Sequence, residues 1–460
     1  MAELKESCAL AGVYGHQHAS RALYLGLFSL QHRGQESCGL IVSHRGKTSN
    51  HKGMGLVWEV FTPKVLERLK GNIGIAHTRY STTGSCSERN IQPFYIEHRG
   101  KMLAVAHNGN LVNSASLRER LEKKGAIFQT SMDTEIIMHL LVRSKAPTYS
   151  DKIYDVLSHL KGAFSLLFYT PDSLIAARDP WGWRPLCLGK LGQGYMVASE
   201  SCAFDLVGAR YLRELEPGEI LTIDKNGLRS RRLPTTRTAH CVFEFIYFSR
   251  PDSRIFGESV YLARKELGRT LAREFPYPGD LVVPIPDSGS VAALGFAQEK
   301  NLPFELGLIR NHYVGRTFIQ PFQKNRDLSV RIKLNPVRDV LKGKRVIIIE
   351  DSIVRGTTSR IRVRNLREAG AKEVYMGVSC PPIKFPCFYG IDFPSREELV
   401  AARYSVEEIG RAMDVDGLHY LSLDGMLSAM ALPREKFCTA CFTGKYPIKP
   451  GKFTKDQFET

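Results

Sequence analysis

The sequence predicts a two-domain protein with an α+β front half and an α/β back half. Its 460 residues exceed one ordinary hydrophobic core, and a content of 43% hydrophobic and 24% charged residues is typical of globular proteins. Short, mostly antiparallel strands are expected in the front half, whereas strand, loop and helix alternate after Gly279. The polar, arginine-rich stretch 225–238 separates the two patterns and is the expected domain border.

Apolar runs bounded by turn residues predict the elements of the front half. We expect strands at 72–78, 101–107, 164–170, 174–177 and 220–223, and helices at 116–124 and 134–142. In the back half, each strand-sized apolar run precedes a helical pattern, which predicts a parallel sheet covered by helices. We expect strands at 281–285, 345–350 and 373–378, with helices that end at Glu299 and Ala369.

Composition and charge exclude several classes of protein. No apolar run is long enough for a membrane-spanning helix, and the polar first residues do not form a targeting signal, so a cytoplasmic protein is expected. Ten cysteines without a signal peptide argue against a disulfide framework. The formal net charge of +17 suits a nucleic acid, a membrane surface or anionic small substrates.

The strongest local signal is the segment Glu350–Ser359, where an apolar strand ends in two adjacent carboxylates. A turn then presents a glycine and three hydroxyl groups at the start of a helix, at Gly356, Thr357, Thr358 and Ser359. Free N–H groups and the positive end of the helix dipole suit a phosphate monoester. Carboxylates at the strand end can reach ribose hydroxyls or Mg²⁺. An ordinary helix cap with exposed acids is the less favoured interpretation.

This segment resembles the phosphoribosylpyrophosphate (PRPP) binding motif of type I phosphoribosyltransferases. The resemblance implies that Glu350 and Asp351 hold the ribose hydroxyls and Mg²⁺, while the loop from Arg355 to Ser359 holds the 5′-phosphate. Many members have two aspartates here, so Glu350 departs by one methylene group. The loop Pro286–Gly289 is then the expected pyrophosphate loop, with Ser288 near the metal.

The stretch 310–320 combines a glycine with clustered cations and is expected to be a loop that can close over a diphosphate. A basic surface loop is the alternative. The stretch is similar to the catalytic loop of the glutamine PRPP amidotransferases, which implies that Arg310 and Arg316 bind PRPP. His312 departs from that family, where arginine is common.

Cys8 follows a short polar leader, and class II glutamine amidotransferases carry a cysteine at their mature N-terminus. A freed N-terminal cysteine combines a thiol nucleophile with an α-amine of pKa about 8, which can serve as its base. The resemblance implies that Cys8 is the nucleophile and that residues 1–7 are a propeptide. A cysteine near a terminus is by itself more often structural.

Four further motifs support the assignment of Cys8, at Gln31–Ser37, His77–Gly84, His107–Asn110 and Ser131–Glu135. Glutamine hydrolysis requires a cation for the α-carboxylate, an anion for the α-ammonium and donors for the oxyanion. The resemblance assigns these roles to Arg79, to Asp133, and to Asn108 together with the Gly109 N–H. In isolation, Asn108-Gly109 would be a hairpin turn and Asp133 a helix-cap acid.

The resemblance to the glutamine PRPP amidotransferase family extends from Cys8 to about Tyr446. It implies a propeptide (1–7), an N-terminal-nucleophile glutamine amidotransferase domain (8–238) and a phosphoribosyltransferase domain with a C-terminal cluster-binding tail (239–460). It also implies that ammonia from glutamine reacts with PRPP to give 5-phosphoribosylamine, the first step of purine synthesis. The aromatic segment Phe243–Asp252 is expected to wall a passage for ammonia, or to be a core strand. Family members are homo-oligomers, commonly tetramers, that purine nucleotides inhibit.

The cysteines near the C-terminus predict a metal site. Cys438-Thr-Ala-Cys441 alone favours zinc. With Cys241 and Cys387, it resembles the ligand set of family members that carry a [4Fe–4S] cluster, which four thiolates can hold. Cys380 is an alternative to Cys387 as the fourth ligand, and reduced buried thiols are the simplest alternative to a metal.

Two other functions stay open at this point. One is a class II amidotransferase with another acceptor, such as a sugar phosphate, although Glu350–Ser359 argues against it. The other is a PRPP-sensing regulator that binds nucleic acid through its positive charge. The sequence has no helix-turn-helix, zinc-finger or RNA-binding signature, so neither nucleic acid nor membrane is expected as a partner.

Overall fold

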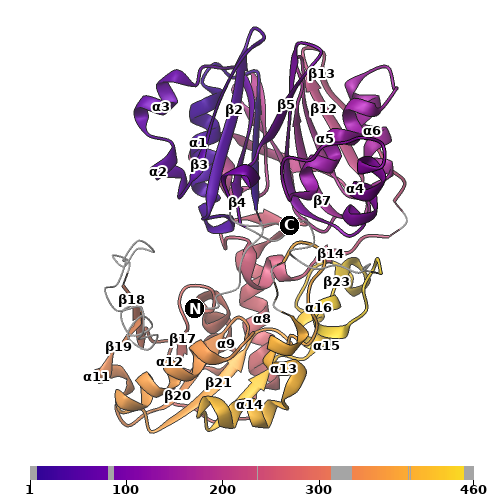
Figure 1. Ribbon diagram of the computed structural model, residues 1–460. Helices are drawn as coiled ribbons and strands as arrows, with labels where there is room; N and C mark the ends of the chain where they lie inside the picture. Colours follow the sequence, from indigo (N-terminus) through magenta and orange to yellow (C-terminus); the bar gives the residue numbers. More distant parts are fainter. Residues whose placement is uncertain are drawn as a thin grey trace.

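The front half of the chain folds into two antiparallel sheets that pack face to face (Figure 1). The computed structural model describes residues 8–80, 87–235, 237–311, 334–391, 393 and 395–449. Within these ranges, none of the helices combines the length and the hydropathy that a membrane span requires.

The first sheet has seven strands in the order β11-β9-β10-β1-β4-β2-β3. Their bounds are β1 Ala9–Tyr14, β2 Ser37–His44, β3 Lys47–Met54, β4 Ile73–Arg79, β9 Cys187–Leu191, β10 Gly194–Ala198 and β11 Arg210–Glu214. The second sheet has the order β13-β12-β8-β7-β6-β5. Its strands are β5 Phe94–His98, β6 Lys101–Leu111, β7 Gly162–Tyr169, β8 Leu174–Arg178, β12 Glu219–Asp224 and β13 Gly227–Arg232.

Helices cover the outer faces of both sheets, so that the front half has four layers (Figure 1). The first sheet is covered by α1 Ala19–Ser29, α2 Val57–Val60, α3 Pro63–Arg68 and α7 Cys202–Val207, and the second by α4 Ser114–Glu122, α5 Asp133–Arg143 and α6 Tyr149–Ser158. Alternation along β1 explains the burial of its residues 9–13. Ala9 and Val13 pack with α1, whereas Leu10 packs between the two sheets.

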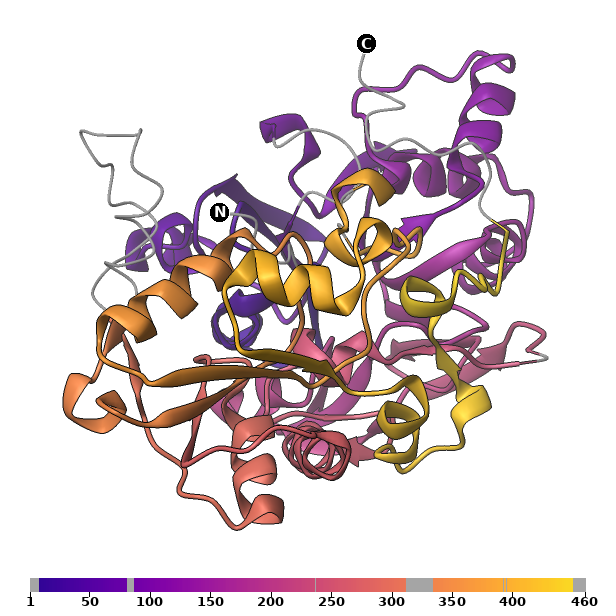
Figure 2. The ribbon, with the colours of Figure 1, turned by 90° about the horizontal axis from the view of Figure 1, so that it is seen from below.

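The back half contains a parallel sheet of four strands in the order β17-β20-β21-β22. The strands are β17 Leu281–Pro284, β20 Arg345–Glu350, β21 Glu373–Val378 and β22 Gly417–Tyr420. Figure 2 shows helices on both faces of this sheet. They include α8 Val260–Glu274, α9 Ser290–Lys300, α12 Thr357–Glu368, α14 Val406–Met413 and α15 Leu423–Ser428, with shorter helices α11 Arg338–Leu341, α13 Val400–Arg403 and α16 Ala440–Thr443.

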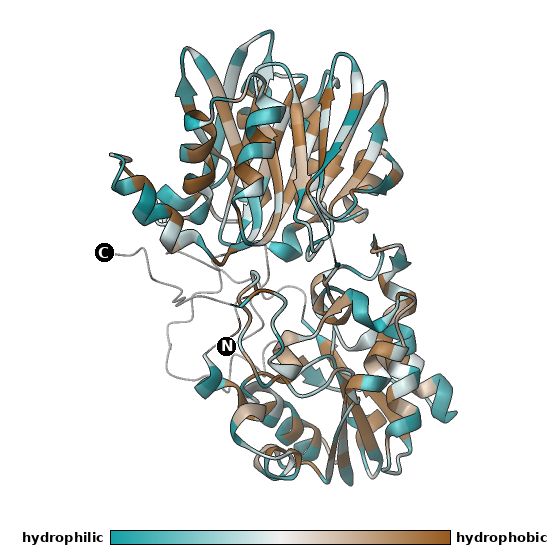
Figure 3. Cartoon of the chain, turned by 90° about the vertical axis from the view of Figure 1, so that its right-hand side faces the viewer, coloured by the Kyte–Doolittle hydropathy of each residue, from teal (hydrophilic) through white to brown (hydrophobic). Residues whose placement is uncertain are grey.

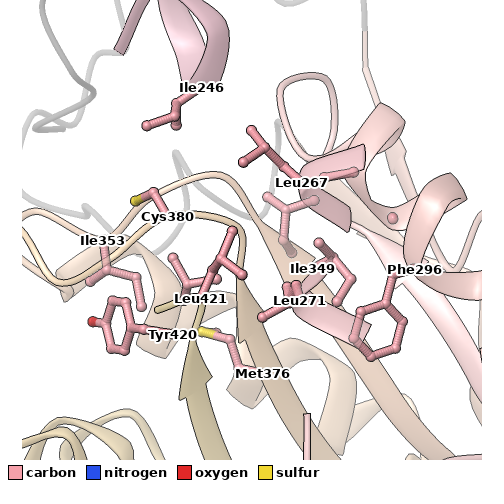
Figure 4. Close-up of a cluster of buried hydrophobic side chains, with 14 of the residues drawn as sticks. Ile246, Leu267, Leu271, Phe296, Ile349, Ile353, Met376, Cys380, Tyr420 and Leu421 are labelled. Atoms are coloured by element: carbon pink, nitrogen blue, oxygen red, sulfur yellow. The ribbon is translucent and has the colours of Figure 1, made fainter. Parts of the chain in front are cut away.

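Hydrophobic residues concentrate in the strands between the layers of each half (Figure 3). In the back half, Ile349 and Met376 from neighbouring strands pack against Leu271 of α8 and Phe296 of α9 (Figure 4). Three two-stranded sheets complete the back half, in the pairs β14 His240–Cys241 with β23 Phe437–Cys438, β15 Arg254–Ile255 with β16 Glu258–Ser259, and β18 Leu308–Arg310 with β19 Leu334–Pro336.

Most predicted elements agree with the structure within two or three residues, and three expectations need correction. The strand expected to end at His107 continues to Leu111, because β6 pairs with β7 along its whole length. Residues 227–232 of the expected border form the edge strand β13, whose charged side chains lie in solvent. The aromatic segment after Val242 is a buried π-helical turn, η3 Glu244–Phe248, and not a core strand.

Helices α8 and α9 cross at two glycines, which generates a stability prediction. A Cβ atom at Gly295 would lie 1.9 Å from the carbonyl oxygen of Lys265, and one at Gly268 would lie 1.8 Å from that of Ala292. We expect Gly295→Ala to destabilise the protein by about 1–3 kcal/mol, because the helices must separate. Gly410→Ala in α14 is the control, since its Cβ would meet only side-chain atoms, of Leu418 at 3.3 Å and of Val415 at 3.6 Å. Equal melting temperatures for the two variants would contradict this prediction.

Candidate functional site

Cys8 lies directly before β1, the central strand of the first sheet, and is 7% exposed. Because Ala9 pairs with Thr78, the Cys8 thiol reaches the end of β4 and donates a hydrogen bond to the carbonyl oxygen of Tyr80 (Sγ···O 3.4 Å). Burial raises the pKa of the Cys8 thiol, and the Arg79 guanidinium opposes that shift. The thiol therefore requires a base before it can act as a nucleophile.

The motif Gln31–Ser37 folds against the same strand end. The Nε of Arg33 donates to the carbonyl oxygen of Cys8 at 3.4 Å. At Gly34, a Cβ atom would lie 2.7 Å from the carbonyl carbon of Thr78. Only glycine therefore allows this loop to approach β4 closely, which explains the need for Gly34 in the motif.

Asn108 and Gly109 lie on β6 of the facing sheet, so the alternative interpretation of this dipeptide as a hairpin turn is wrong. His77 of β4 donates from Nε2 to the carbonyl oxygen of His107 at 3.1 Å, which ties the two sheets together here. Both polar atoms of the Asn108 side chain are buried without a hydrogen-bond partner. Buried amides are normally satisfied, so this one is available to a bound ligand. At Gly109, φ is +149°, and a Cβ atom would lie 2.1 Å from the carbonyl oxygen of Ala163.

Asp133 is the first residue of α5 and lies beside the same segment. Its Oδ1 lies 3.3 Å from Nδ1 of His107, and its Oδ2 accepts a hydrogen bond from the Leu111 N–H at 3.0 Å. Burial alone raises the pKa of the Asp133 carboxyl, but His107 and the Leu111 N–H outweigh it and lower the pKa overall. Asp133 is therefore a buried anion, and Arg79 is a buried cation at the end of β4.

The structure thus brings together the five residues that the sequence analysis selected in the front half, at Cys8, Arg79, Asn108, Gly109 and Asp133. The stretch 81–86 of the motif His77–Gly84 lies outside the described residues. The sequence analysis did not single out His107 or Arg33, although both lie inside motifs that it quoted.

The second site lies at the carboxyl end of β20. Glu350 and Asp351 are both buried there, and Asp351 accepts hydrogen bonds from Ser288 and Ser352, each at 2.5 Å. Burial raises the pKa of Glu350 to about 7 and also raises that of Asp351. Two buried carboxylates and the hydroxyl of Ser288 form an oxygen-rich donor set, which suits a divalent cation that would keep the carboxylates ionised. Arg362 of α12 pairs with Glu350, and the sequence analysis did not identify it.

Two loops border these carboxylates. A Cβ atom at Gly289 would lie 2.4 Å from the carbonyl oxygen of Ile349, so the loop Pro286–Gly289 packs directly on β20. Gly356 has φ of +76° and turns the chain into α12, where Ser359 is buried. This arrangement directs the N-terminus of α12 toward the strand end, as a phosphate site requires.

Of the three arginines that the sequence predicts to bind PRPP, two form ion pairs in the structure and one lies outside the described residues. Arg355 pairs with Glu398, and Arg310 pairs with Asp287 of the neighbouring loop. Arg316 lies outside the described residues, together with the rest of 312–333. The side chains of Thr357 and Thr358 are also outside the described part of the chain.

Four cysteines selected from the sequence line one cavity, at Cys241, Cys387, Cys438 and Cys441. Cys241 pairs with Cys438 through the parallel strands β14 and β23. Burial raises the pKa of Cys241 to about 12 and that of Cys438 to about 11. Cys380 lies in the hydrophobic core, where its thiol donates to the carbonyl oxygen of Pro381 (Figure 4).

The donors around the cavity suit a group with several acceptor atoms. Among the described residues, no three Cys, His, Asp or Glu side chains gather closely enough to hold a single ion. Two buried donors that line the cavity, Nε1 of Trp183 and Nε of Arg184, have no hydrogen-bond partner. An anionic group with several acceptor atoms would satisfy both donors.

Comparisons with known proteins extend over nearly the whole chain. A family model described as "Glutamine amidotransferase domain" matches residues 77–205. The chain is 51% identical to amidophosphoribosyltransferase 1, chloroplastic, of Arabidopsis thaliana, with 97% of this chain and 79% of that protein covered. It is 50% identical to the amidophosphoribosyltransferase of Bacillus subtilis, with 97% and 95% covered.

A solved structure of the Bacillus subtilis glutamine PRPP amidotransferase in complex with ADP and GMP has the same fold. The TM-score is 0.92 at 49% identity, with 97% of this chain and 99% of that chain covered. A structure described as the allosteric regulatory enzyme of purine biosynthesis also matches with a TM-score of 0.92. The predicted fold class is therefore confirmed.

The buried His77 generates a prediction about stability and pH. Burial lowers the pKa of His77 to about 3, so the folded protein keeps it neutral while the unfolded chain takes up a proton near pH 6.5. The contribution of neutral His77 to the free energy of unfolding is therefore complete above pH 6.5. It decreases by about 1.4 kcal/mol per pH unit as the pH falls toward 3. We expect thermal melting of His77→Gln to depend less steeply on pH between 6 and 4. The exposed His159→Gln is the control, and identical slopes for both variants would refute the prediction.

Proposed function

The chain belongs to the amidophosphoribosyltransferase family, and we propose that it joins two reactions in one molecule. Glutamine is hydrolysed to glutamate and ammonia in the front half. The ammonia then displaces pyrophosphate from PRPP in the back half, which gives 5-phosphoribosylamine, the first intermediate of purine biosynthesis. The observation that carries this function is the presence of both sites in one chain that aligns along nearly its whole length with such enzymes.

We assign the glutaminase chemistry to the residues around Cys8. The thiol attacks the glutamine amide carbon and forms a glutamyl thioester as ammonia leaves, and water then hydrolyses the thioester. The hydrogen-bond partner of the thiol is the carbonyl oxygen of Tyr80, which cannot take its proton. The base is therefore the α-amine of Cys8, which supports the proposal that residues 1–7 are a propeptide that must be removed.

The remaining roles follow from charge and burial. The unpartnered Asn108 amide, with the Gly109 N–H, stabilises the oxyanion of the tetrahedral intermediate. Arg79 binds the α-carboxylate of glutamine, and Asp133 binds its α-ammonium group. The lowered pKa of Asp133 supports this role, because the carboxyl stays ionised throughout the neutral range.

We assign PRPP binding to the carboxyl end of β20 and the loops beside it. Glu350 and Asp351 bind the ribose hydroxyls, and the loop from Arg355 to Ser359 with the N-terminus of α12 binds the 5′-phosphate. Ser288 and the loop Pro286–Gly289 face the pyrophosphate. Two cations of the proposed closing loop bind PRPP. Arg310 lies within the described residues, whereas Arg316 does not and is assigned from the sequence.

Two cofactors fit the donor sets. Ser288, Glu350 and Asp351 would hold Mg²⁺, which neutralises the charge of the pyrophosphate leaving group. Cys241, Cys387, Cys438 and Cys441 would hold a [4Fe–4S] cluster, whose role is structural because neither reaction transfers electrons. Among the described residues, no compact ligand set for a single ion is present, and two donors of the cavity are unpartnered, so the cluster is favoured over a single zinc ion.

The proposed domains are 8–238 and 239–460, with the ammonia passage at their junction. The wall of that passage includes the buried Phe243, Phe245 and Phe248, of which Phe243 packs with Phe393 and Phe442 of the back half. An apolar, closed passage keeps ammonia from protonation in bulk water. We further propose that the protein forms a homo-oligomer, commonly a tetramer in this family. We also propose that purine nucleotides inhibit it, which the ADP and GMP bound in the Bacillus subtilis structure support.

The test of this function is glutamate release by anaerobically purified protein with and without PRPP and Mg²⁺. We expect PRPP to stimulate release strongly and pyrophosphate to appear at the same rate. Cys8→Ser should lose glutamine-dependent pyrophosphate formation by roughly a thousandfold or more but keep the reaction with ammonium chloride, because only the nucleophile is lost. Cys38→Ala, at a buried cysteine in β2, is the control. Glutamate formation that ignores PRPP would show a different acceptor.

The cluster assignment predicts a difference between two neighbouring cysteines. We expect Cys387→Ser to lose iron and sulfide, because Cys387 lines the cavity, and Cys380→Ser to retain both. Elemental analysis and the visible absorption spectrum of anaerobic protein provide the measurement. Zinc instead of iron in the parent protein, or iron loss only from Cys380→Ser, would overturn the assignment.

A further inference from the structure

A buried network of charged residues crosses the junction between the two halves, and Glu244 lies at its centre. Glu244 is the first residue of η3 and is fully buried. Its carboxylate accepts hydrogen bonds from Arg33 at 2.8 and 2.9 Å, from Arg184 at 2.9 Å and from the Ser249 hydroxyl at 2.8 Å. Glu244 thus connects Arg33 of the front half, Arg184 at the cysteine cavity and Ser249 at the end of its own turn.

The first arm of the network reaches the nucleophile. Arg33 is completely buried and contacts Glu244 with both terminal nitrogens. Its Nε donates to the carbonyl oxygen of Cys8 at 3.4 Å, and Nη1 also binds Glu200 at 2.6 Å. Arg33 therefore holds the main chain of the nucleophile, so a displacement of Glu244 is transmitted to Cys8.

The second arm ends at the cysteine cavity. Arg184 lines this cavity and donates from Nη2 to the carbonyl oxygen of Tyr389 at 3.1 Å. Tyr389 also lines the cavity and stacks on Trp183, with ring centroids 4.4 Å apart. A group bound among the cysteines would therefore fix the position of Arg184, which in turn fixes one side of Glu244.

The third arm reaches toward the PRPP carboxylates. Arg264 of α8 donates to the carbonyl oxygens of Phe245, Tyr247 and Ser249, at 2.7, 2.8 and 2.8 Å. It thus holds the main chain of the turn that carries Glu244. The same helix packs on the strand that carries the carboxylates, because Leu271 of α8 lies in the core with Ile349, the residue before Glu350. A shift of the end of β20 on PRPP binding therefore reaches Arg264 and the turn through α8.

We propose that Glu244 is a positioning residue that couples PRPP binding to the reactivity of Cys8, with Arg264 and Arg33 as the two connecting side chains and Arg184 as the anchor. This inference rests on the proposed function, since it requires glutamine and PRPP sites in the same chain. Coupling requires an element whose position both sites bias, and the turn Glu244–Ser249 contacts side chains from both halves. Apolar residues would fill the same volume, but they would not make the directional hydrogen bonds that tie the turn to both halves.

The experiment compares Glu244→Gln with Glu219→Gln in enzyme from which residues 1–7 have been removed and whose cysteine cavity holds its cluster, at matched iron content. Glu219 is the control, because its buried carboxylate also binds an arginine, Arg213, at 2.7 and 2.8 Å, although the Arg213 side chain is 42% exposed. We expect Glu244→Gln to reduce the stimulation of glutaminase by PRPP about tenfold, within the usual range of coupling between sites. Its pyrophosphate formation with ammonium chloride should stay within about twofold of the parent, because the PRPP site is intact.

A second readout does not depend on turnover. The rate of Cys8 alkylation by iodoacetamide is measured by peptide mass with and without PRPP and Mg²⁺. We expect PRPP to change this rate in the parent and in Glu219→Gln, but not in Glu244→Gln. Ser249→Ala removes one hydrogen bond from the carboxylate without changing its charge, and we expect it to give a smaller loss of stimulation.

The outcomes separate this inference from the proposed function. Parent protein that uses neither glutamine nor ammonia with PRPP would refute the function itself. Parent protein with full coupling, together with full coupling in Glu244→Gln, would refute the role of Glu244 alone. Loss of the ammonia reaction in both Glu244→Gln and Ser249→Ala would assign the turn to folding of the PRPP site and would also overturn the inference.

Discussion

Burial of Glu244 between two guanidinium groups is the constraint that connects the two halves of this molecule. The carboxylate, Arg33 and Arg184 are all withdrawn from water, so each charge must be compensated by the others. Loss of one partner from such a set typically costs about 3–5 kcal/mol, because an unpaired charge stays buried. The three side chains therefore fix the position of the turn η3 relative to Cys8 and to the cysteine cavity, whereas apolar contacts alone would allow alternative packings.

Both active centres follow the same structural rule, although their sheets differ. In each, the reactive groups lie where a buried strand ends, because the strand is held by its neighbours while the following residues are free to present side chains. Cys8 precedes the central strand of an antiparallel sheet, and Arg79 ends the adjacent strand. Asp351 follows a central strand of a parallel sheet, close to the N-terminus of α12. Rigid strands thus position groups whose chemistry depends on distances of a few ångströms.

The extent of prediction from sequence differs between particular residues. The strands 345–350 and 373–378 were predicted with their final bounds, because strand-sized apolar runs bounded by turn residues are typical of a covered parallel sheet. The strand 101–107 was predicted to end before Asn108-Gly109, a dipeptide typical of hairpins, but pairing with β7 extends the strand to Leu111. Arg362, Arg33 and Glu244 were not selected, because a charged residue in a helix or loop gives no local sign of burial.

The sequence by itself determined the order of the elements, the parallel sheet and the motifs that contain Cys8, Asn108 and Glu350, because periodicity and short-range spacing are local properties. Only the tertiary structure decided which cysteine joins the other three. Cys380 and Cys387 are seven positions apart, yet the chain directs one into the hydrophobic core and the other into the cavity. The same holds for the contacts of Glu244, since its partners lie 60 and 211 positions away and only folding brings them together.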